Sequence, residues 1–427
     1  MQFSKIFRHT FGLAYVACGL ECRGLAAEPV DAWPEWQLKG LLEGRIALTD
    51  PTPSWQDRGF GKTRYGGSAS GEQRGVLTGE ASVVAQAHIS WNLTAVASLT
   101  ANEQQRHAVD AVEAYLLYKS DPSSAHRFRF KLGAFFPPVS LENTGLAWTS
   151  PYTINSSAIN TWIGEELRTI GAEATFAKAN DAGEWSVSAA AFGFNDPVGS
   201  LLAWRGWAVH DREAGLRDRL PLAALPSFAP GGSAAGQANA VTPFTEIDDR
   251  VGYYLGAAWA GADGIRVRTL WYDNQANSRA FDGRQYGWRT RFGSVAASST
   301  IFEATDIVVQ TMIGNIKMAA FPTFTVVDND FSSVSVLLSR QWQQHRVSAR
   351  VEYFDVTDRD FTRDDPNGEH GSAATLSYVY RPDDNQRLTF ELLNVRSTRQ
   401  SRAGFGLSPR ANETTLQASY RFFFSTK

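Results

Sequence analysis

The chain has 427 residues, of which 43% are apolar and 12% aromatic, with 41 Lys and Arg against 44 Asp and Glu. This composition excludes an intrinsically disordered chain, and the formal net charge of -3 excludes a general polyanion binder, so we expect no nucleic-acid partner. Both cysteines, Cys18 and Cys22, lie near the N-terminus, so disulfides are not expected to stabilise the rest of the chain.

Residues 1–27 have the features of a secretory signal peptide. Lys5 and Arg8 precede a short apolar stretch, and Leu25-Ala26-Ala27 offers small residues for cleavage. The apolar stretch is about half of the ~20 residues that a membrane-spanning helix needs. We therefore expect export and cleavage, which leaves residues 28–427 as the mature chain. Lipid modification of Cys18 is the alternative.

From residue 37 onward, apolar and polar residues alternate with a period of two, as in Leu388, Phe390 and Leu392 against Thr389 and Glu391. This period indicates strands with one apolar face. Most of these strands have the ~9 to 11 residues that a tilted strand needs to cross a bilayer. The predicted strands cover residues 37–47, 79–90, 92–102, 110–119, 126–136, 166–177, 184–194, 249–260, 263–273, 285–293, 302–314, 331–341, 345–356, 372–381, 386–396 and 414–424.

The connections between these strands alternate between long and short. The long ones are residues 48–78, 137–165, 195–248, 274–284, 315–330, 357–371 and 397–413. An up-and-down barrel with short inner turns and long outer loops produces this alternation, whereas a Greek-key sandwich does not. The last strand, with Leu416, Tyr420, Phe422 and Phe424 on one parity, resembles the C-terminal assembly signal of outer-membrane β-barrel proteins.

The sequence therefore predicts an all-β fold, a transmembrane antiparallel up-and-down β-barrel of about 16 strands. A closed sheet pairs every backbone donor and acceptor in lipid and leaves no edge. A barrel of this size encloses water rather than a bore filled by the side chains of its own strands.

Strand parity assigns side chains to the lumen or to the lipid. On the polar parity, Arg and Lys outnumber Asp and Glu, and rings of basic residues favour anions in pores. The alternative is that these charges pair across strands and only stiffen the wall. The residues expected to line the pore are Arg127, Arg129, Lys131, Arg266, Arg268, Arg289, Arg291, Arg350, Arg421, Glu113, Glu352 and Glu391.

Aromatic residues on the apolar parity or near strand ends are expected to form girdles at the two membrane interfaces. They are Tyr115, Tyr118, Trp185, Trp259, Trp271, Trp288, Tyr353, Tyr378 and Tyr380. Arg168 shares its parity with Ile170 and Ala172, so it is expected to face outward at the outer rim.

The stretch from Phe128 to Glu173 contains Lys131-Leu132-Gly133-Ala134-Phe135-Phe136-Pro137, Ser140-Leu141-Glu142 and Glu166-Leu167-Arg168-Thr169-Ile170-Gly171. It is similar to the corresponding stretch of the phosphate-selective porin O/P family, and the whole mature chain resembles Gram-negative general or nutrient porins. The resemblance implies a sixteen-stranded, usually trimeric barrel whose third outer loop folds inward and whose basic residues conduct anions. That loop would be residues 137–165, with Glu142, Asn143 and Thr144 at the constriction, and it departs from the family pattern in containing no Lys or Arg.

The longest outer loop, residues 195–248, mixes Leu and Trp with Arg, which predicts a short amphipathic helix ending at Pro221 that caps or plugs the mouth. The alternative is an outer loop packed on its neighbours. The acidic residues between 358 and 369 lack EF-hand spacing, so we predict no metal site.

We therefore expect an outer-membrane porin of a Gram-negative bacterium that passes small hydrophilic solutes by diffusion, prefers anions, contacts outer-membrane lipid and uses no cofactor. The homotrimer is implied by the resemblance. Two alternatives stay open. One is a secreted or surface carbohydrate-binding β protein, which would be soluble without detergent. The other is an outer-membrane hydrolase on a barrel scaffold, which would use His88 and Ser90 near Glu80.

Overall fold

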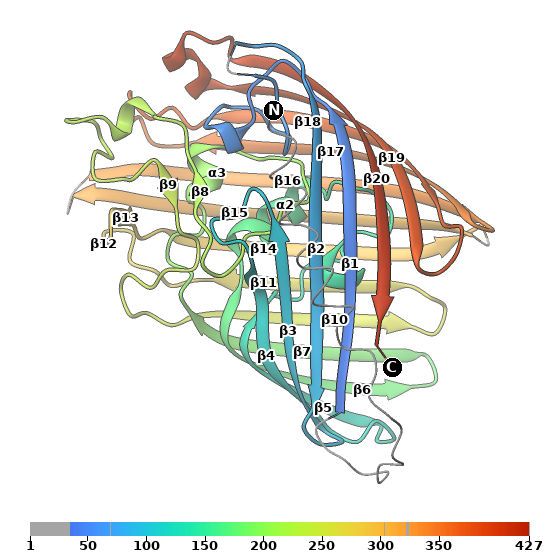
Figure 1. Cartoon of the computed structure of the whole chain (residues 1–427). Coiled ribbons are helices and arrows are strands. Elements are labelled where there is room, and N and C mark those ends of the chain that lie inside the picture. The colour runs from blue at the N-terminus through green and yellow to red at the C-terminus, as the bar shows by residue number, and fades with distance from the viewer. Residues whose placement is uncertain (1–34, 69, 303, 322–323, 427) are drawn as a thin grey trace.

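The computed structural model describes residues 35–68, 70–302, 304–321 and 324–426, so the predicted signal peptide lies outside the described residues. Sixteen strands form one closed antiparallel barrel in which each strand pairs with the next along the chain and β1 pairs with β20 (Figure 1). The barrel strands are β1 (Glu35–Leu48), β2 (Gly75–His88), β3 (Leu93–Asn102), β4 (Asp110–Lys119), β5 (His126–Phe135), β6 (Thr169–Asn180), β7 (Gly183–Gly193), β10 (Gly252–Gly261), β11 (Arg266–Asp273), β14 (Arg289–Ile301), β15 (Thr305–Phe321), β16 (Phe324–Trp342), β17 (His345–Asp358), β18 (Glu369–Tyr380), β19 (Gln386–Arg399) and β20 (Arg410–Ser425).

The predicted fold class is confirmed: every predicted strand corresponds to one barrel strand, and the topology is up-and-down throughout. The alternation in sequence is the cause. On β19, Phe390 is 50% exposed on the outer surface, whereas its neighbour Glu391 is 1% exposed inside the barrel. Strands with this alternation present apolar side chains outward and polar side chains inward.

The prediction of an outer loop at residues 315–330 is wrong. This stretch continues β15 to Phe321 and starts β16 at Phe324, so a tall hairpin stands where a loop was expected. Its polar side chains pair across the strands, with Lys317 Nζ 2.8 Å from Asp328 Oδ2. These polar residues form the outer face of a strand pair whose inner face, with Met318 and Val327, is buried.

Two long connections between barrel strands fold into the barrel interior. We call residues 136–168, between β5 and β6, loop L3, and residues 194–251, between β7 and β10, loop L4. The helices and short strands that are not part of the barrel wall are η1 (Trp55–Asp57), η2 (Leu146–Trp148), α2 (Ala158–Glu166), α3 (Ser200–Trp204), β8 (Leu220–Pro221), η3 (Pro226–Phe228), β9 (Ala240–Val241), β12 (Phe281–Asp282), β13 (Gln285–Tyr286) and η4 (Gln400–Phe405). Figure 1 shows the helices α2 and α3 of L3 and L4 within the barrel outline.

L3 and L4 build an apolar core inside the barrel. Trp162 on α2 and Leu201 on α3 are 1% and 0% exposed, and the Trp162 ring packs edge-on against Phe292 of β14 at 5.6 Å. The predicted helix ending at Pro221 is wrong, because α3 ends at Trp204 and Pro221 lies in strand β8. Gly206, with a φ of +82°, turns the chain away two residues after the helix. Among the described helices, none is long and apolar enough to cross a membrane.

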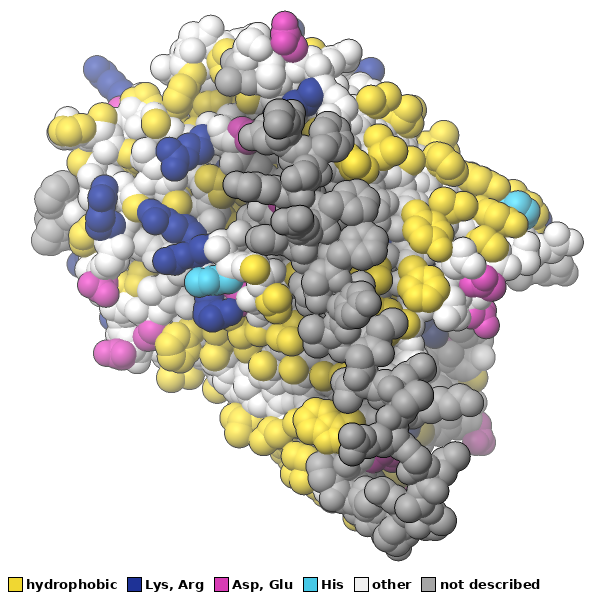
Figure 2. All heavy atoms as spheres, in the orientation of Figure 1, with side chains coloured by type: hydrophobic (Ala, Val, Ile, Leu, Met, Phe, Trp, Pro, Cys, Tyr) yellow, Lys and Arg dark blue, Asp and Glu magenta, His cyan; other side chains and the backbone are white. Residues whose placement is uncertain are grey.

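The outer surface carries the apolar face of the strands. Figure 2 shows hydrophobic side chains gathered over the strands on the right of this view and Lys and Arg side chains gathered toward the loop end on the left. Tyr118, Trp271 and Tyr353 are 36%, 47% and 49% exposed on the outward parity, as predicted for girdle residues. Two predicted girdle residues are wrong: Tyr115 shares the inward parity of Glu113, and Trp288 is 1% exposed beside Trp204.

Candidate functional site

Part of the inner wall of the barrel is accessible to solvent. On β5 and β11, the inward side chains of Arg129 and Arg266 are exposed, and those of Arg127 and Lys131 are 35% and 24% exposed. On the opposite side, inward residues such as Arg350 are covered by L3. The solvent-accessible inner wall therefore includes parts of β4, β5 and β11.

This accessible side carries more positive than negative charge. Arg127 pairs with Glu184, and Lys131 Nζ lies 3.7 Å from Glu173 Oε1. In contrast, no ion pair joins Arg129, Arg266 or Arg268 to a carboxylate within the described part of the chain. The three guanidinium groups are electrostatic neighbours, and Arg268 Nη1 donates to the Ser140 carbonyl of L3 at 2.7 Å. We call Arg127, Arg129, Lys131, Arg266 and Arg268 the basic wall.

L3 crosses the lumen and is fixed to β17 and β19 by buried charges. Arg350 Nη1 donates to Glu142 Oε1 at 2.6 Å and also binds the Asn155 carbonyl. Glu391 accepts the backbone N–H of Asn155 at 3.1 Å. Glu352 accepts the N–H of Ala158 at 2.6 Å, which places a carboxylate at the N-terminus of α2, where the helix dipole favours negative charge.

L4 is fixed to the seam between β1 and β20. Asp211 of L4 receives hydrogen bonds from Arg45 Nη1 at 2.9 Å and Arg64 Nη1 at 3.1 Å, and Arg421 Nη2 lies 3.7 Å away. A second contact joins the Trp207 indole to the Asp355 carbonyl of β17 at 3.1 Å. The interior charges on this side of the barrel therefore hold loops rather than face an open channel.

The structure divides the predicted pore-lining residues into three groups. The five residues of the basic wall and Glu113 face the lumen and are at least partly exposed. Arg350, Arg421, Glu352 and Glu391 also face inward but are buried at 5% exposure or less. The prediction for Arg289 and Arg291 is wrong. They alternate with the buried Thr290 and Phe292, so they lie on the outer surface.

The error on β14 has a physical reason. The prediction of Trp288 as a lipid-facing aromatic agrees with Arg289 and Arg291 facing inside. The interior at this level is not water but the apolar core of L3 and L4, so the aromatic side chains face inward. The arginines then face outward, where Arg289 Nη2 pairs with Asp273 at 2.8 Å.

The residues predicted at the constriction are also distributed differently from the expectation. Glu142 and Asn143 are 3% and 7% exposed, so they hold L3 in place, while Thr144 is exposed. The prediction for Arg168 is also wrong. Its side chain is 1% exposed and donates to carbonyls of L3 and L4 instead of lying at the outer rim.

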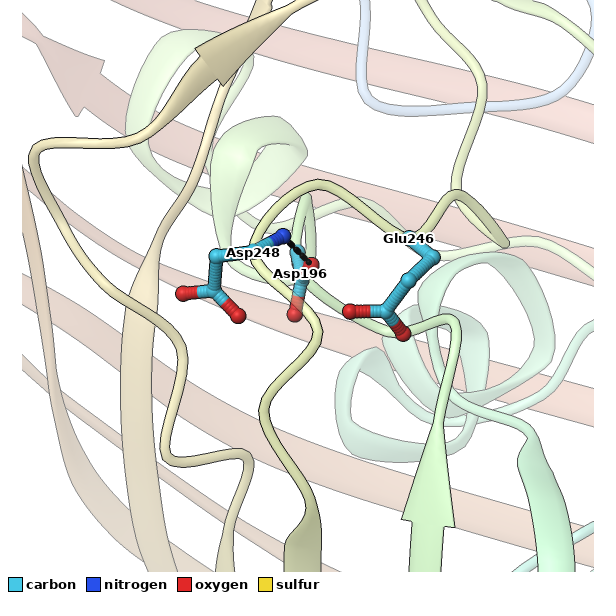
Figure 3. Close-up of side chains that lie close together, drawn as sticks. All are labelled: Asp196, Glu246 and Asp248. Atoms are coloured by element: carbon cyan, nitrogen blue, oxygen red, sulfur yellow. Dashed lines mark hydrogen bonds between the residues drawn. The ribbon is translucent and has the colours of Figure 1, made fainter.

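Sequence reasoning missed a group of three carboxylates at the base of L4. The side chains of Asp196, Glu246 and Asp248 converge (Figure 3), and one oxygen of each lies within 4.8 Å of the others. Carboxylate oxygens are the ligands that Ca²⁺ takes in proteins. Burial, together with the negative charges of Asp248 and Glu246, raises the pKa of Asp196 to about 7, against the opposing N–H of Ile247. Asp196 is far from the other two in sequence, so spacing gave no signal.

The residues considered for hydrolysis do not assemble into a triad. His88 Nδ1 lies 3.1 Å from Thr94 Oγ1, and Ser90 Oγ donates to Asn92 at 2.7 Å. Glu80 accepts a hydrogen bond from Arg64 at 2.9 Å. Each candidate group thus has a different partner from the one that a Ser-His-acid relay requires.

A closed sixteen-stranded barrel is a fold that this chain shares with several solved outer-membrane proteins. Among solved structures, the chain is similar to the outer membrane channel DcaP of Acinetobacter baumannii, with a TM-score of 0.58 and 11% identity over 94% of this chain and 100% of that one. It is also similar to a loop L8 deletion mutant of OmpT, an outer membrane protein of Vibrio cholerae, at 0.51 and 10% identity over 92% and 100%. An anion-selective porin from Comamonas acidovorans gives 0.50 and 11% identity over 91% and 99%. No protein-family model and no curated protein matches the chain.

Proposed function

We propose that the protein is an outer-membrane porin through which small hydrophilic solutes diffuse along the basic wall. The support is a barrel with an apolar outer face, a partly exposed polar inner wall and the fold of outer-membrane channels. No chemical step or cofactor is part of this proposal. The carbohydrate-binding alternative predicts solubility without detergent, which the apolar outer face disfavours.

The porin of this proposal prefers anions. The observation that carries this preference is the set of three arginines, Arg129, Arg266 and Arg268, that face the lumen without a carboxylate partner within the described residues. Fixed positive charge at a pore wall raises the local concentration of anions and lowers that of cations. One similar structure is titled an anion-selective porin, which agrees with this reading.

The test is the reversal potential of single channels in a planar bilayer under a KCl gradient. The variant with Arg129→Gln, Arg266→Gln and Arg268→Gln should lose most of the anion preference. Three charges about 10 Å from a permeating ion contribute about 1.2 kcal/mol at the dielectric constant of water, or roughly eightfold in the local concentration of each ion. Screening at about 0.15 M ionic strength reduces this effect to roughly twofold, so the measurement belongs at low salt.

The matched control changes three outward arginines, Arg289→Gln, Arg291→Gln and Arg359→Gln, and thus alters the net charge equally. We expect its selectivity to equal that of the unmodified protein. A cation-preferring unmodified channel, or equal changes in both variants, would contradict the proposal.

The narrower expectations stay predictions. They are membership of the phosphate-selective porin O/P family, a homotrimer, constriction by residues 137–165 and cleavage after residue 27. The mass of the detergent-solubilised complex tests the homotrimer, and N-terminal sequencing of protein from the outer membrane tests cleavage.

A further inference from the structure

A polar groove of about 460 Å³ lies on the outer surface of the barrel over β17–β20. The side chains of Tyr353, His370, Ser372, Arg396, Thr398, Arg410 and Asn412 in its lining belong to the outward parity, so it is separated from the lumen by the barrel wall. None of the residues that line it is acidic. The groove is therefore a basic depression on the face that a membrane protein turns toward lipid.

The groove consists of two rungs of facing residues on β18, β19 and β20. In one rung Ser372 opposes Arg396, which opposes Asn412. In the next rung His370 opposes Thr398, which opposes Arg410. Diagonal neighbours of this kind lie about 7–8 Å apart, so both guanidinium groups can reach a single phosphate, with hydroxyl and amide donors beside them.

The groove lies immediately above the apolar belt. Going toward the long loops on β19, the outward residues are Phe390 and Leu392, then Asn394 and Arg396. On β18 the outward Leu376 is followed by Ala374 and then Ser372. Tyr353, which is 49% exposed, lines the groove at its lower side, where interfacial aromatics are found. The rungs thus begin one to two pleats above the apolar edge, at the level of the lipid head groups.

The two arginines of the groove differ from three paired cations on the outer surface. Arg289 pairs with Asp273, Lys317 with Asp328 and Arg359 with Asp330. Arg396 and Arg410 are exposed, and neither forms an ion pair with a carboxylate of the described residues. Arg396 and Arg410 thus lack an ion-pair partner among the described residues, and an anion from outside can compensate their charge.

We propose that this groove binds the phosphorylated head group of a glycolipid in the outer leaflet, with Arg396 and Arg410 on the phosphate. The acyl chains would then lie against the apolar belt below Ser372 and Asn412. The inference rests on the proposed membrane location but not on anion conduction. Reversal potentials test conduction and lipid binding tests the groove, so the two can fail separately.

The experiment measures binding to the intact barrel in neutral detergent by native mass spectrometry. The probes are lipid A with two phosphates, the same glycolipid without phosphates, and inorganic phosphate. We expect the phosphorylated glycolipid to bind best, and the variant with Arg396→Gln and Arg410→Gln to bind it about tenfold more weakly or worse. Heat-dependent migration in SDS gels verifies that the variant barrel is folded.

The matched control is the variant with Arg289→Gln and Arg359→Gln, which removes the same charge from the rim outside the groove. It should bind the glycolipid as the unmodified protein does. Unchanged binding by the groove variant, or an equal loss in the control, would overturn the proposal. Inorganic phosphate that competes at the same concentration as the glycolipid would identify a site for a free anion and overturn the lipid assignment.

Discussion

Arg168 joins β4, L3 and L4 through one buried guanidinium group. Its Nη2 donates to the carbonyls of Gly164 and Ala214 at 3.1 and 3.0 Å, and its Nε donates to that of Val112 at 3.0 Å. The guanidinium carbon lies 3.6 Å from the centroid of the Phe136 ring, a cation–π contact. A planar fork of donors suits this set of carbonyls, and a lysine ammonium does not.

Replacing Arg168 by Met should therefore leave several buried carbonyls without donors, at about 1–3 kcal/mol for each unsatisfied group. We expect a lower midpoint of thermal unfolding in detergent, followed by tryptophan fluorescence, with Arg168→Lys intermediate. An Arg168→Met variant as stable as the unmodified protein would contradict this role.

The orientation of single residues could be predicted where the outer face alone is apolar. On β5, Phe128 and Phe130 face outward and Arg129 faces the lumen, as the alternation indicates. The burial of Arg350 could not be predicted, because its partner Glu142 lies 208 residues away in the sequence. Parity gives the face of a strand but does not reveal which loop covers that face.

At the scale of elements, the attachment of L4 depends on the protonation of Asp196. This carboxyl accepts the N–H groups of Ile247 and Asp248, which follow each other at the end of L4. Its raised pKa means that the folded loop binds the proton more tightly than the unfolded chain does. The contribution of Asp196 to the stability of the loop is therefore fully present below the ordinary pKa of 3.8 and is lost as the pH rises through about 7.

We expect amide exchange at residues 245–250, corrected for its intrinsic pH dependence, to be faster at pH 8 than at pH 5.5. Asp196→Asn keeps an acceptor oxygen but cannot ionise, so it should make the corrected rates equal at the two pH values. A variant that retains the full difference would assign the pH response to another group.

The strands could be predicted from the sequence because their period is local, and β4 has the predicted bounds. The β15–β16 hairpin could not be predicted, since polar residues on the outer face of a strand resemble those of a loop. The helices α2 and α3 are short and buried on all sides, so they carry no amphipathic period that a sequence pattern can reveal.

At the scale of the whole molecule, the barrel is closed by residues from its two ends. Gly40 of β1 lies beneath the ring of Phe424 on β20, and a Cβ at position 40 would come 2.2 Å from that ring. The terminal aromatic alternation, which indicated an assembly signal, thus also packs on the seam. This link between the first and last strands follows from the circular pairing order and could be predicted once the barrel was inferred.

The anchors of L3 and L4 also determine when these loops can dock during folding. Asn155 of L3 binds Glu391, which lies 236 residues away, and Asp211 of L4 accepts from Arg45 across 166 residues. Contacts of such separation form slowly because a large loop must close first. Refolding should therefore proceed in two phases, with strand circular dichroism appearing before Trp162, Trp204 and Trp207 become shielded from a quencher. Simultaneous phases would contradict this order. If the strands form first, an early intermediate has a closed barrel whose bore is not yet filled by L3 and L4.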